Sequence, residues 1–236
     1  MMSPLSSPVL FHVGPIPVTQ PVVTTWGIMA VLTVGAACIS LSLTPEAPGR
    51  LQTFLELGVT ALDRQIRETM RTEPAPYRSF VGTLFLFILV ANWSSLVPGV
   101  QPPTAVLATD AALAITVFLA IIIFGVRSGG VRGYLRSFLW PSVVMIPLNL
   151  IGTVTRTFSL MVRLFGNVMA GVFIIGIVLS LAGLLVPVPL MALDLLTGAV
   201  QAYIFAILAM VFISGVLTRP ALSATSQSIE KTGSRS

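Results

Sequence analysis

Residues 157–171 read Thr-Phe-Ser-Leu-Met-Val-Arg-Leu-Phe-Gly-Asn-Val-Met-Ala-Gly and hold one arginine, Arg163, inside a long hydrophobic run. The apolar sequence continues to Val186, so Arg163 does not belong to a loop. An arginine at the centre of a membrane helix costs about 2.5 to 3.5 kcal/mol on insertion scales, and such residues usually face a partner or a water-filled cavity. We therefore expect the surroundings of Arg163 to carry function.

The whole chain is unusually apolar. Of its 236 residues 55% are hydrophobic and 9% are charged, and the mean hydropathy is +0.97. Soluble domains have about 25% charged residues, so the composition predicts an integral membrane protein. The formal net charge of +5 does not indicate nucleic-acid binding, because the arginines are spread over separate regions instead of forming one basic face.

Three residue counts exclude classes of site. One cysteine, Cys38, and one histidine, His12, cannot supply the three or four ligands of a Cys/His metal site or form a disulfide framework. The single lysine, Lys231, lies in a polar tail, so the chain has no Gly-Lys-Ser/Thr phosphate loop. We expect no metal, no cofactor and no nucleotide site in this chain.

Hydrophobic runs predict an all-α membrane protein with a single membrane domain at residues 22–218. Five segments are long enough to cross a hydrocarbon core of about 30 Å. These spans fall at residues 22–43, 80–97, 105–126, 148–182 and 189–217. Residues 1–21, which are rich in proline, are expected to form an irregular exposed tail, and residues 219–236 a polar cytoplasmic tail.

Residues 50–71 have a different pattern. Apolar residues recur there at spacings of three and four, and most charged residues fall on the other side, which predicts an amphipathic helix at the membrane surface. Arginines concentrate in the 44–78 and 127–136 loops, and the segments 1–21 and 98–104 contain no lysine or arginine. The positive-inside rule then places the N-terminus outside, and the C-terminus and the surface helix on the cytoplasmic side.

The last two spans are too long to stand upright. Residues 148–182 would form a helix of about 52 Å, and residues 189–217 one of about 43 Å, at about 1.5 Å per residue. Both exceed the hydrocarbon thickness of about 30 Å. We expect them to form a long, slanted antiparallel hairpin.

Both long spans carry polar residues at helical spacing. These residues are Asn149, Arg156, Ser159, Arg163 and Asn167 on the first span, and Asp194 and Gln201 on the second. Arg163 and Asp194 could form an ion pair that merely ties the hairpin together. A plain tether needs no stripe of amides, and apolar residues often replace a buried ion pair at no cost in stability. A polar path for an ion is the interpretation that we favour.

Five segments resemble one family. They read Ser-Leu-Met-Val-Arg-Leu-Phe-Gly-Asn-Val-Met-Ala-Gly (159–171), Gln-Ala-Tyr-Ile-Phe-Ala-Ile-Leu (201–208), Asn-Trp-Ser-Ser-Leu-Val-Pro-Gly (92–99), Pro-Pro-Thr-Ala (102–105) and Ile-Pro-Leu-Asn-Leu-Ile (146–151). On these motifs the chain resembles subunit a of bacterial F-type ATP synthases, the membrane stator that conducts protons past the rotating ring of c subunits. The resemblance covers most of the chain from about residue 18 to 218.

The resemblance implies roles for individual residues. Arg163 matches the essential stator arginine, which faces the carboxylate of each passing c subunit and prevents a direct leak between two offset half-channels. Gln201 matches the glutamine that faces this arginine from the neighbouring helix. Asn167 matches an asparagine beside the outer half-channel, and Ser159 lies on the same face as Arg163. Asp194 falls where relatives have a histidine or a carboxylate, which makes it the candidate outer proton relay.

The sequence also departs from the family at three places. Val172 stands where a number of relatives have an ionisable residue, and Gly152 where relatives often have Glu. Relatives often have Asp at the position of Val106, whereas the acid here is Asp110, four residues later. Further candidates for lining the channels are Asp110, Asn92, Tyr203 and Asn149.

The resemblance implies a non-catalytic subunit of a bacterial inner-membrane complex. Its expected partners are the c-subunit ring, the b subunits of the peripheral stalk, and membrane lipid. Three alternatives stay open: translocation of sodium by the same kind of subunit, a secondary transporter in which Arg163 binds an anionic solute, and a passive scaffold. The sequence shows no inverted repeat of the kind common in secondary transporters.

Overall fold

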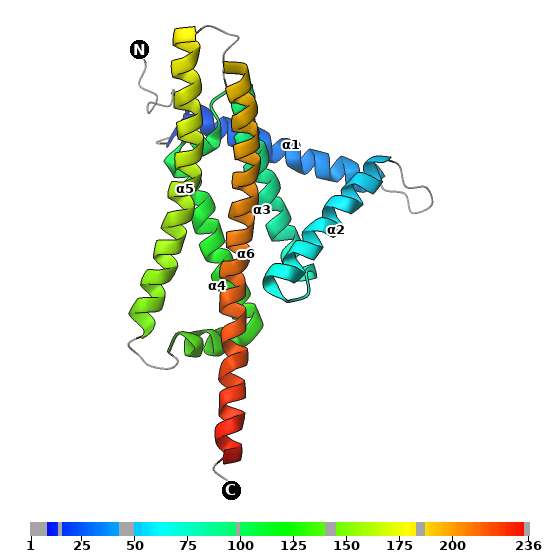
Figure 1. The fold of residues 1–236 in the computed structure, drawn as a ribbon, viewed down its shortest axis with the longest axis vertical. Helices are drawn as coiled ribbons and strands as arrows, with labels where there is room; N and C mark the ends of the chain where they lie inside the picture. Colours follow the sequence, from blue (N-terminus) through cyan, green and yellow to red (C-terminus); the bar gives the residue numbers. More distant parts are fainter. Residues whose placement is uncertain are drawn as a thin grey trace.

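The computed structural model describes residues 9–13, 16–42, 50–97, 100–139, 145–182 and 187–233. Side chains are described in residues 19–41, 52–97, 100–128, 151–181 and 188–217. Six α-helices and two short 3-10 helices follow in chain order (Figure 1). They are α1 (Gln20–Ser42), α2 (Arg50–Met70), α3 (Ala75–Trp93), η1 (Ser94–Leu96), η2 (Pro103–Ala105), α4 (Leu107–Leu139), α5 (Met145–Ala182) and α6 (Pro187–Gly233).

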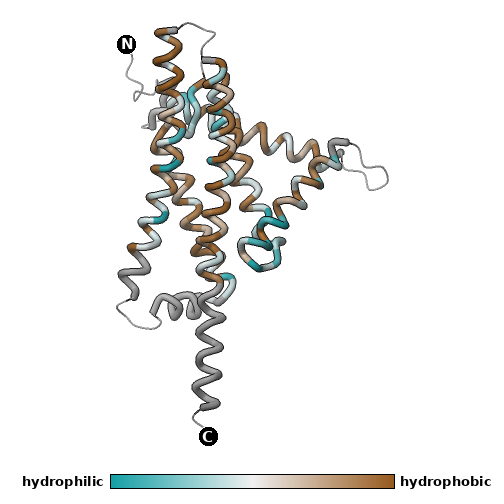
Figure 2. Tube along the Cα trace, in the orientation of Figure 1, coloured by the Kyte–Doolittle hydropathy of each residue, from teal (hydrophilic) through white to brown (hydrophobic). Residues whose placement is uncertain are grey.

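Five of these helices are long and apolar enough to cross a membrane, which confirms the predicted number of spans. The membrane-spanning segments are Gln20–Leu41, Ala75–Leu96, Leu107–Ser128, Ile151–Leu181 and Val188–Leu217. Brown, hydrophobic residues run along these helices in Figure 2. The chain is therefore a multi-pass membrane protein.

Helices α5 and α6 form the long hairpin that their lengths predict. They have 38 and 47 residues, and so extend about 57 and 70 Å at about 1.5 Å per residue. They run side by side along the long axis of the molecule, whereas α1 leaves the bundle at a steep angle to them (Figure 1). If α1 stands upright across the bilayer, α5 and α6 are strongly tilted, as expected of helices longer than the hydrocarbon core.

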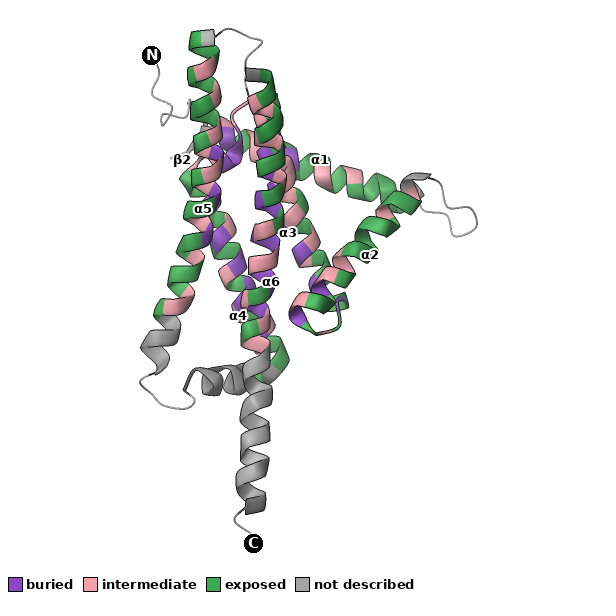
Figure 3. Cartoon of the chain, viewed as in Figure 1, coloured by how far each residue is buried: buried purple, intermediate pink, exposed green. Residues whose placement is uncertain are grey.

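The apolar core lies where α3, α4, α5 and α6 face one another (Figure 3). The α6 residues in this core lie one or two turns apart, such as Ala202, Phe205 and Ala209, each 1% exposed or less. Leu164 of α5 and Ile88 of α3 are completely buried against the same core. Alanines on α6 leave no bulky side chain between the backbones, which suits the close helix packing typical of membrane interiors.

Helix α2 is the predicted amphipathic helix, found at Arg50–Met70. Its C-terminal half docks on the bundle through Ile66 and Met70, which are 0% and 3% exposed. Asp63 of α2 also accepts two hydrogen bonds from the guanidinium of Arg78 at the start of α3, one of them from Nε at 2.6 Å. Apolar and ionic contacts together attach this half of α2 to the bundle.

Two expectations outside the spans need correction. The tail at residues 1–21 is not irregular throughout, because β1 (Val9–Val13) and β2 (Ile16–Thr19) pair as an antiparallel hairpin rich in β-branched residues. The expected loop at 127–136 is helical to Leu139, with a break at Gly130, where φ is 67°. Helix α6 continues beyond its predicted span through the polar tail to Gly233, since a polar composition does not by itself oppose a helix.

Candidate functional site

Arg163 lies on an exposed side of α5. The residues of α5 that face the core are Leu160, Leu164 and Val168, which recur once per turn and are 2%, 0% and 6% exposed. Arg163 is exposed on a flank of this buried face, together with Arg156 and Ser159. The exposed residues that follow on this side are small, Gly166 and Ala170. The stripe predicted from sequence therefore lies along the edge of the buried face, with Arg163 exposed there.

The Arg163 side chain has no partner within the chain as described. Among the described residues, ion pairs form between Arg64 and Glu68 and between Arg78 and Asp63, and none involves Arg163 or Asp194. The tether between Arg163 and Asp194 is therefore absent from this part of the structure. A guanidinium has five donors and no acceptor, so in a membrane it needs polar partners from another molecule or from water.

Asp194 lies in a niche formed by three elements. Its Oδ2 accepts a hydrogen bond of 3.3 Å from Ser95 Oγ of η1. Its Oδ1 lies over Gly171 of α5, so close that a Cβ atom at position 171 would overlap it. The carboxylate is half-buried. Ser95 and Gly171 thus determine the position of the Asp194 carboxylate, which is the only acidic group in the membrane-spanning segments of α5 and α6.

The end of α3 holds α6 beside this niche. Asn92 is 5% exposed, and its Nδ2 donates a 3.0 Å hydrogen bond to the carbonyl of Gly198. A Cβ atom at Gly198 would come within 3.0 Å of Asn92 Cβ, so the glycine allows the two helices to approach closely. Trp93 Nε1 donates to the carbonyl of Leu195 at 3.2 Å. Two side chains of α3 therefore bind the α6 backbone just after Asp194.

Gln201 is buried with an unsatisfied donor. It is 6% exposed, and its Nε2 has no hydrogen-bond partner among the described residues. Such a group costs about 1 to 3 kcal/mol of desolvation when it stays unpaired. No hydrogen bond joins Gln201 to Arg163 in the part of the chain that the structure describes, and the side chain of half-buried Asn167 has none there either.

The secondary candidates lie in different surroundings. Asp110, in the first turn of α4, is 0% exposed, and neither carboxylate oxygen has a hydrogen-bond partner among the described residues. Thr104 of η2 is equally buried, and its hydroxyl is unpaired within the same set. Tyr203 lies on an exposed side of α6 and donates to Gln65 of α2. Asn149 falls outside the residues whose side chains are described.

A cavity of about 410 Å³ opens between α4, α5 and α6, about two turns before Arg163 along α5. Its lining includes Arg156, Phe212 and Gly215. The Arg156 guanidinium carbon lies 5.5 Å from the centroid of the Phe212 ring, a distance at which a cation is attracted to the ring face. None of the described residues that line the cavity has a carboxylate.

Three contact residues were not predicted from the sequence. Ser95 and Gly171 shape the Asp194 niche, and Gln65 binds Tyr203. Ser95 could have been found from the polar run Asn-Trp-Ser-Ser at the end of an apolar span. Gly171 could have been found because it is one of several small residues at helical spacing on its helix. Gln65 had no such signal, because its partner is 138 residues away.

Comparisons with known proteins show similarity to one family. A family model described as ATP synthase A chain matches residues 22–214. ATP synthase subunit a 2 of a Bradyrhizobium species is 52% identical over 215 residues, which are 91% of this chain and 96% of the relative. ATP synthase subunit a of Albidiferax ferrireducens is 48% identical, with 82% and 84% of the two chains covered. ATP synthase subunit a 2 of a Picosynechococcus species is also 48% identical, with 83% and 84% covered. The chain belongs to the ATP synthase A chain family.

Proposed function

We propose that this chain is the ion-translocating stator subunit of a rotary F-type ATP synthase and that protons are its coupling ion. One observation carries the proposal: Arg163 lies exposed on a membrane-spanning helix, with no ion-pair partner among the described residues, in a chain that belongs to this family. A partner on the open side of α5 is the simplest way to stabilise that charge. The c-subunit ring, with one carboxylate per subunit, has the required chemistry.

The role of Arg163 follows from its charge. A fixed guanidinium stabilises the ionised form of a carboxylate that comes close to it, so a ring carboxylate passing Arg163 releases its proton. The same positive charge repels protons that would cross directly between the two half-channels. Gly166 and Ala170, exposed on the same side of α5, let a ring helix approach closely. Proton flow is then coupled to rotation of the ring.

The outer half-channel is assigned to the Asp194 niche. Asp194 accepts a proton from the outer side and passes it toward the ring, and Ser95 holds its carboxylate while Gly171 leaves it room. Asn92, Asn167 and Asp110 extend this polar region. Buried Asp110 and Thr104 both have unpaired oxygen atoms among the described residues, which suits a path that takes up water or protons. Gln201 presents a buried amide that orients Arg163 or the ring carboxylate without neutralising either.

The cavity lined by Arg156 is the candidate inner half-channel. It lies between α4, α5 and α6 on the side of Arg163 that the proposed topology turns toward the cytoplasm. Because its described lining has no carboxylate, protons would leave through water and not by way of an acidic relay. Arg156 adds a second fixed positive charge, which extends the region where a ring carboxylate stays ionised.

We assign the chain to the bacterial inner membrane, with its N-terminus outside and its C-terminus in the cytoplasm. Its partners are the c-subunit ring, the peripheral-stalk b subunits and the remaining synthase subunits. ATP is made or hydrolysed on those other subunits, and this chain is non-catalytic. It conducts ions without a metal or cofactor of its own.

The Arg163→Ala variant tests the proposal in the assembled complex. We expect ATP-driven proton pumping into membrane vesicles to be abolished while the c-ring still co-purifies, because Arg163 acts on the moving carboxylate and not on assembly. Arg156→Ala is the matched control and should retain part of the pumping. Coupled pumping by Arg163→Ala at the unmodified rate would refute the stator role.

Two further measurements separate the alternatives. Pumping that requires added sodium would identify sodium as the coupling ion. Uptake of a labelled anion by the purified chain, lost in Arg163→Ala, would identify a secondary transporter instead.

A further inference from the structure

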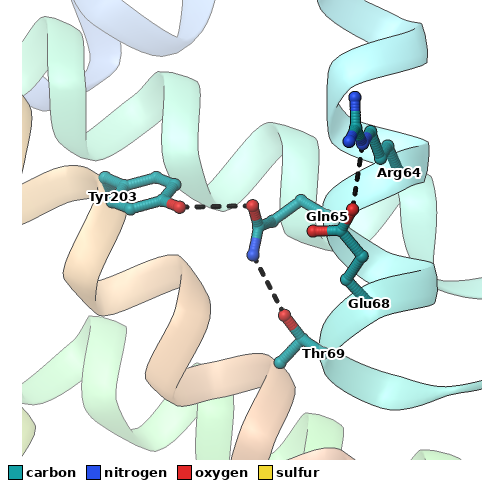
Figure 4. Close-up of polar contacts among 5 residues, drawn as sticks. All are labelled: Arg64, Gln65, Glu68, Thr69 and Tyr203. Carbon is teal, nitrogen blue, oxygen red and sulfur yellow. Dashed lines mark hydrogen bonds and ion pairs between the residues drawn. The ribbon is translucent and has the colours of Figure 1, made fainter.

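A polar link joins the surface helix α2 to the middle of the membrane-spanning part of α6. Tyr203 Oη donates a 3.2 Å hydrogen bond to Gln65 Oε1, and Gln65 Nε2 donates one of 3.1 Å to Thr69 Oγ1 (Figure 4). Both ends of the Gln65 amide are therefore satisfied. Nothing in the proposed ion path uses this link.

The link is made by a partly exposed residue in the membrane-spanning part of α6. Tyr203 lies midway along the segment Val188–Leu217 and is 46% exposed. Near Gln65 on α2, the side chains of the ion pair Arg64 and Glu68 are 81% and 58% exposed, as expected of a helix at the membrane surface. We therefore give the link the weight of an average hydrogen bond between membrane helices.

Tyr203 and Gln201 lie on opposite sides of α6. Successive residues of an α-helix are about 100° apart, so two positions separate these side chains by about 200°. Their exposure agrees, since Gln201 is 6% exposed and Tyr203 is 46% exposed. A bond that holds Tyr203 on one side of the helix therefore also determines the side of α6 from which Gln201 projects.

Residues near Gln65 attach α2 firmly to the helix bundle. They include Asp63, which is ion-paired with Arg78 of α3, and Ile66, which is completely buried. Asn92 of α3 in turn binds the backbone of α6 at Gly198, five residues before Tyr203. Helix α6 is thus held through its backbone at Gly198 and through the side chains of Asp194 and Tyr203, and the Tyr203 contact is the one that attaches it to α2.

We propose that Tyr203 and Gln65 are positioning residues that lock the rotation of α6, so that the Gln201 amide points into the ion path. The inference rests on the proposed function, because it gives Gln201 its purpose. It also gives α2 a role in ion transport: this helix holds α6 in the rotation that turns Gln201 toward the ion path. Release of the lock lets α6 rotate, and Gln201 then no longer meets Arg163 or the ring carboxylate reproducibly.

A double-mutant cycle in the assembled synthase tests the lock. We expect Tyr203→Phe and Gln65→Leu each to lower the number of protons pumped per ATP hydrolysed by up to about threefold, because loss of an average hydrogen bond between membrane helices changes the equilibrium between locked and unlocked states by about that factor. The double variant should be no worse than either single variant, because both remove the same bond. A merely structural role would change the amount of complex in the membrane and leave this ratio unchanged.

Tyr77→Phe is the matched control, since it also removes a phenol hydroxyl, and Tyr77 packs on Phe124 with no hydrogen bond of its hydroxyl among the described residues. A ratio in Tyr203→Phe equal to that in Tyr77→Phe would overturn the lock. The stator role would still stand if Arg163→Ala abolished pumping in the same preparation. Additive losses in the double variant would also overturn the lock.

Cross-linking gives a test that does not depend on lost activity. In a chain carrying Cys38→Ser, the pair Gln65→Cys and Tyr203→Cys is joined by a short bifunctional thiol reagent. We expect the cross-linked complex to pump at least as well as the unlinked pair, because the lock stays closed during ion transport. Loss of pumping on cross-linking would show that α2 and α6 must separate, which contradicts the proposal.

Discussion

Arg163 and Asp194 carry opposite charges on neighbouring helices, yet they do not neutralise each other within the described chain. Asp194 is held by Ser95 and by the space over Gly171, whereas Arg163 is exposed without a partner there. An ion pair would stabilise the hairpin, but it would use up both charges. Under the proposed function, their separation leaves Arg163 available to a ring carboxylate and Asp194 available to exchange a proton.

Gly171 is the residue on which the Asp194 niche depends most directly. Gly171→Ala would place a methyl group where Asp194 Oδ1 lies, so the carboxylate must move and lose its bond to Ser95. Because the displaced atom is the tip of a flexible side chain, the helices can keep their places, and we expect pumping to fall with little change in the thermal stability of the complex. Measurement of ATP-driven pumping in vesicles checks this expectation.

Gly176→Ala serves as the control for Gly171→Ala. It lies on the same helix, and a Cβ atom there meets nothing within 4 Å. Equal pumping by the two alanine variants would contradict the assignment of the niche to the ion path.

At the scale of elements, hydrophobic length predicted the membrane helices well. The over-long segments at 148–182 and 189–217 predicted the hairpin of α5 and α6, because a helix of known rise cannot stand upright in a thinner bilayer. Polar segments were predicted less well, since composition does not distinguish a loop from a helix outside the membrane. This is why the helical course of α4 to Leu139 and of α6 to Gly233 was missed.

The contact between α3 and α6 offers a prediction at this scale. Gly198→Leu would force α3 away from α6, because even a Cβ atom comes within 3.0 Å of Asn92 Cβ. Glycine costs a helix about 1 kcal/mol relative to better formers, whereas overpacking costs about 1 to 3 kcal/mol, so the net effect is destabilising. We expect a lower thermal stability of the complex and less of this subunit retained in it.

Gly215→Leu is the comparison for Gly198→Leu. It makes the same change on the same helix, at a position where a Cβ atom meets nothing within 4 Å. Its thermal stability should match or exceed that of the unmodified protein. A similar loss in both variants would show that the close approach of α3 at Gly198 is not what the glycine provides.

At the scale of the molecule, the polar stripe of α5 and the niche of Asp194 differ in what determines them: the stripe depends on spacing within one helix, and the niche on packing between helices. Helical spacing in sequence placed Arg156, Ser159 and Arg163 on one side of α5, and the structure keeps them exposed there. The niche depends on packing between segments about 75 to 100 residues apart in sequence, from Ser95 to Gly171 and Asp194, which spacing alone does not reveal. Residue types were therefore predictable where one helix carries them, and contacts between helices were not.

The arrangement of basic residues predicts the orientation of the whole chain. With Cys38→Ser as background, Ser7→Cys should react with a membrane-impermeant maleimide added outside intact cells, and Ser234→Cys only in inverted vesicles. The reason is that arginines kept on the cytoplasmic side determine which loops stay there, and an odd number of crossings separates the two termini. Reaction of both cysteines from the same side would contradict the five-span topology, and reaction of each from the opposite side would reverse it. A reversed chain would turn the Asp194 niche toward the cytoplasm and the Arg156 cavity outward, so this labelling pattern decides which half-channel each of them can serve.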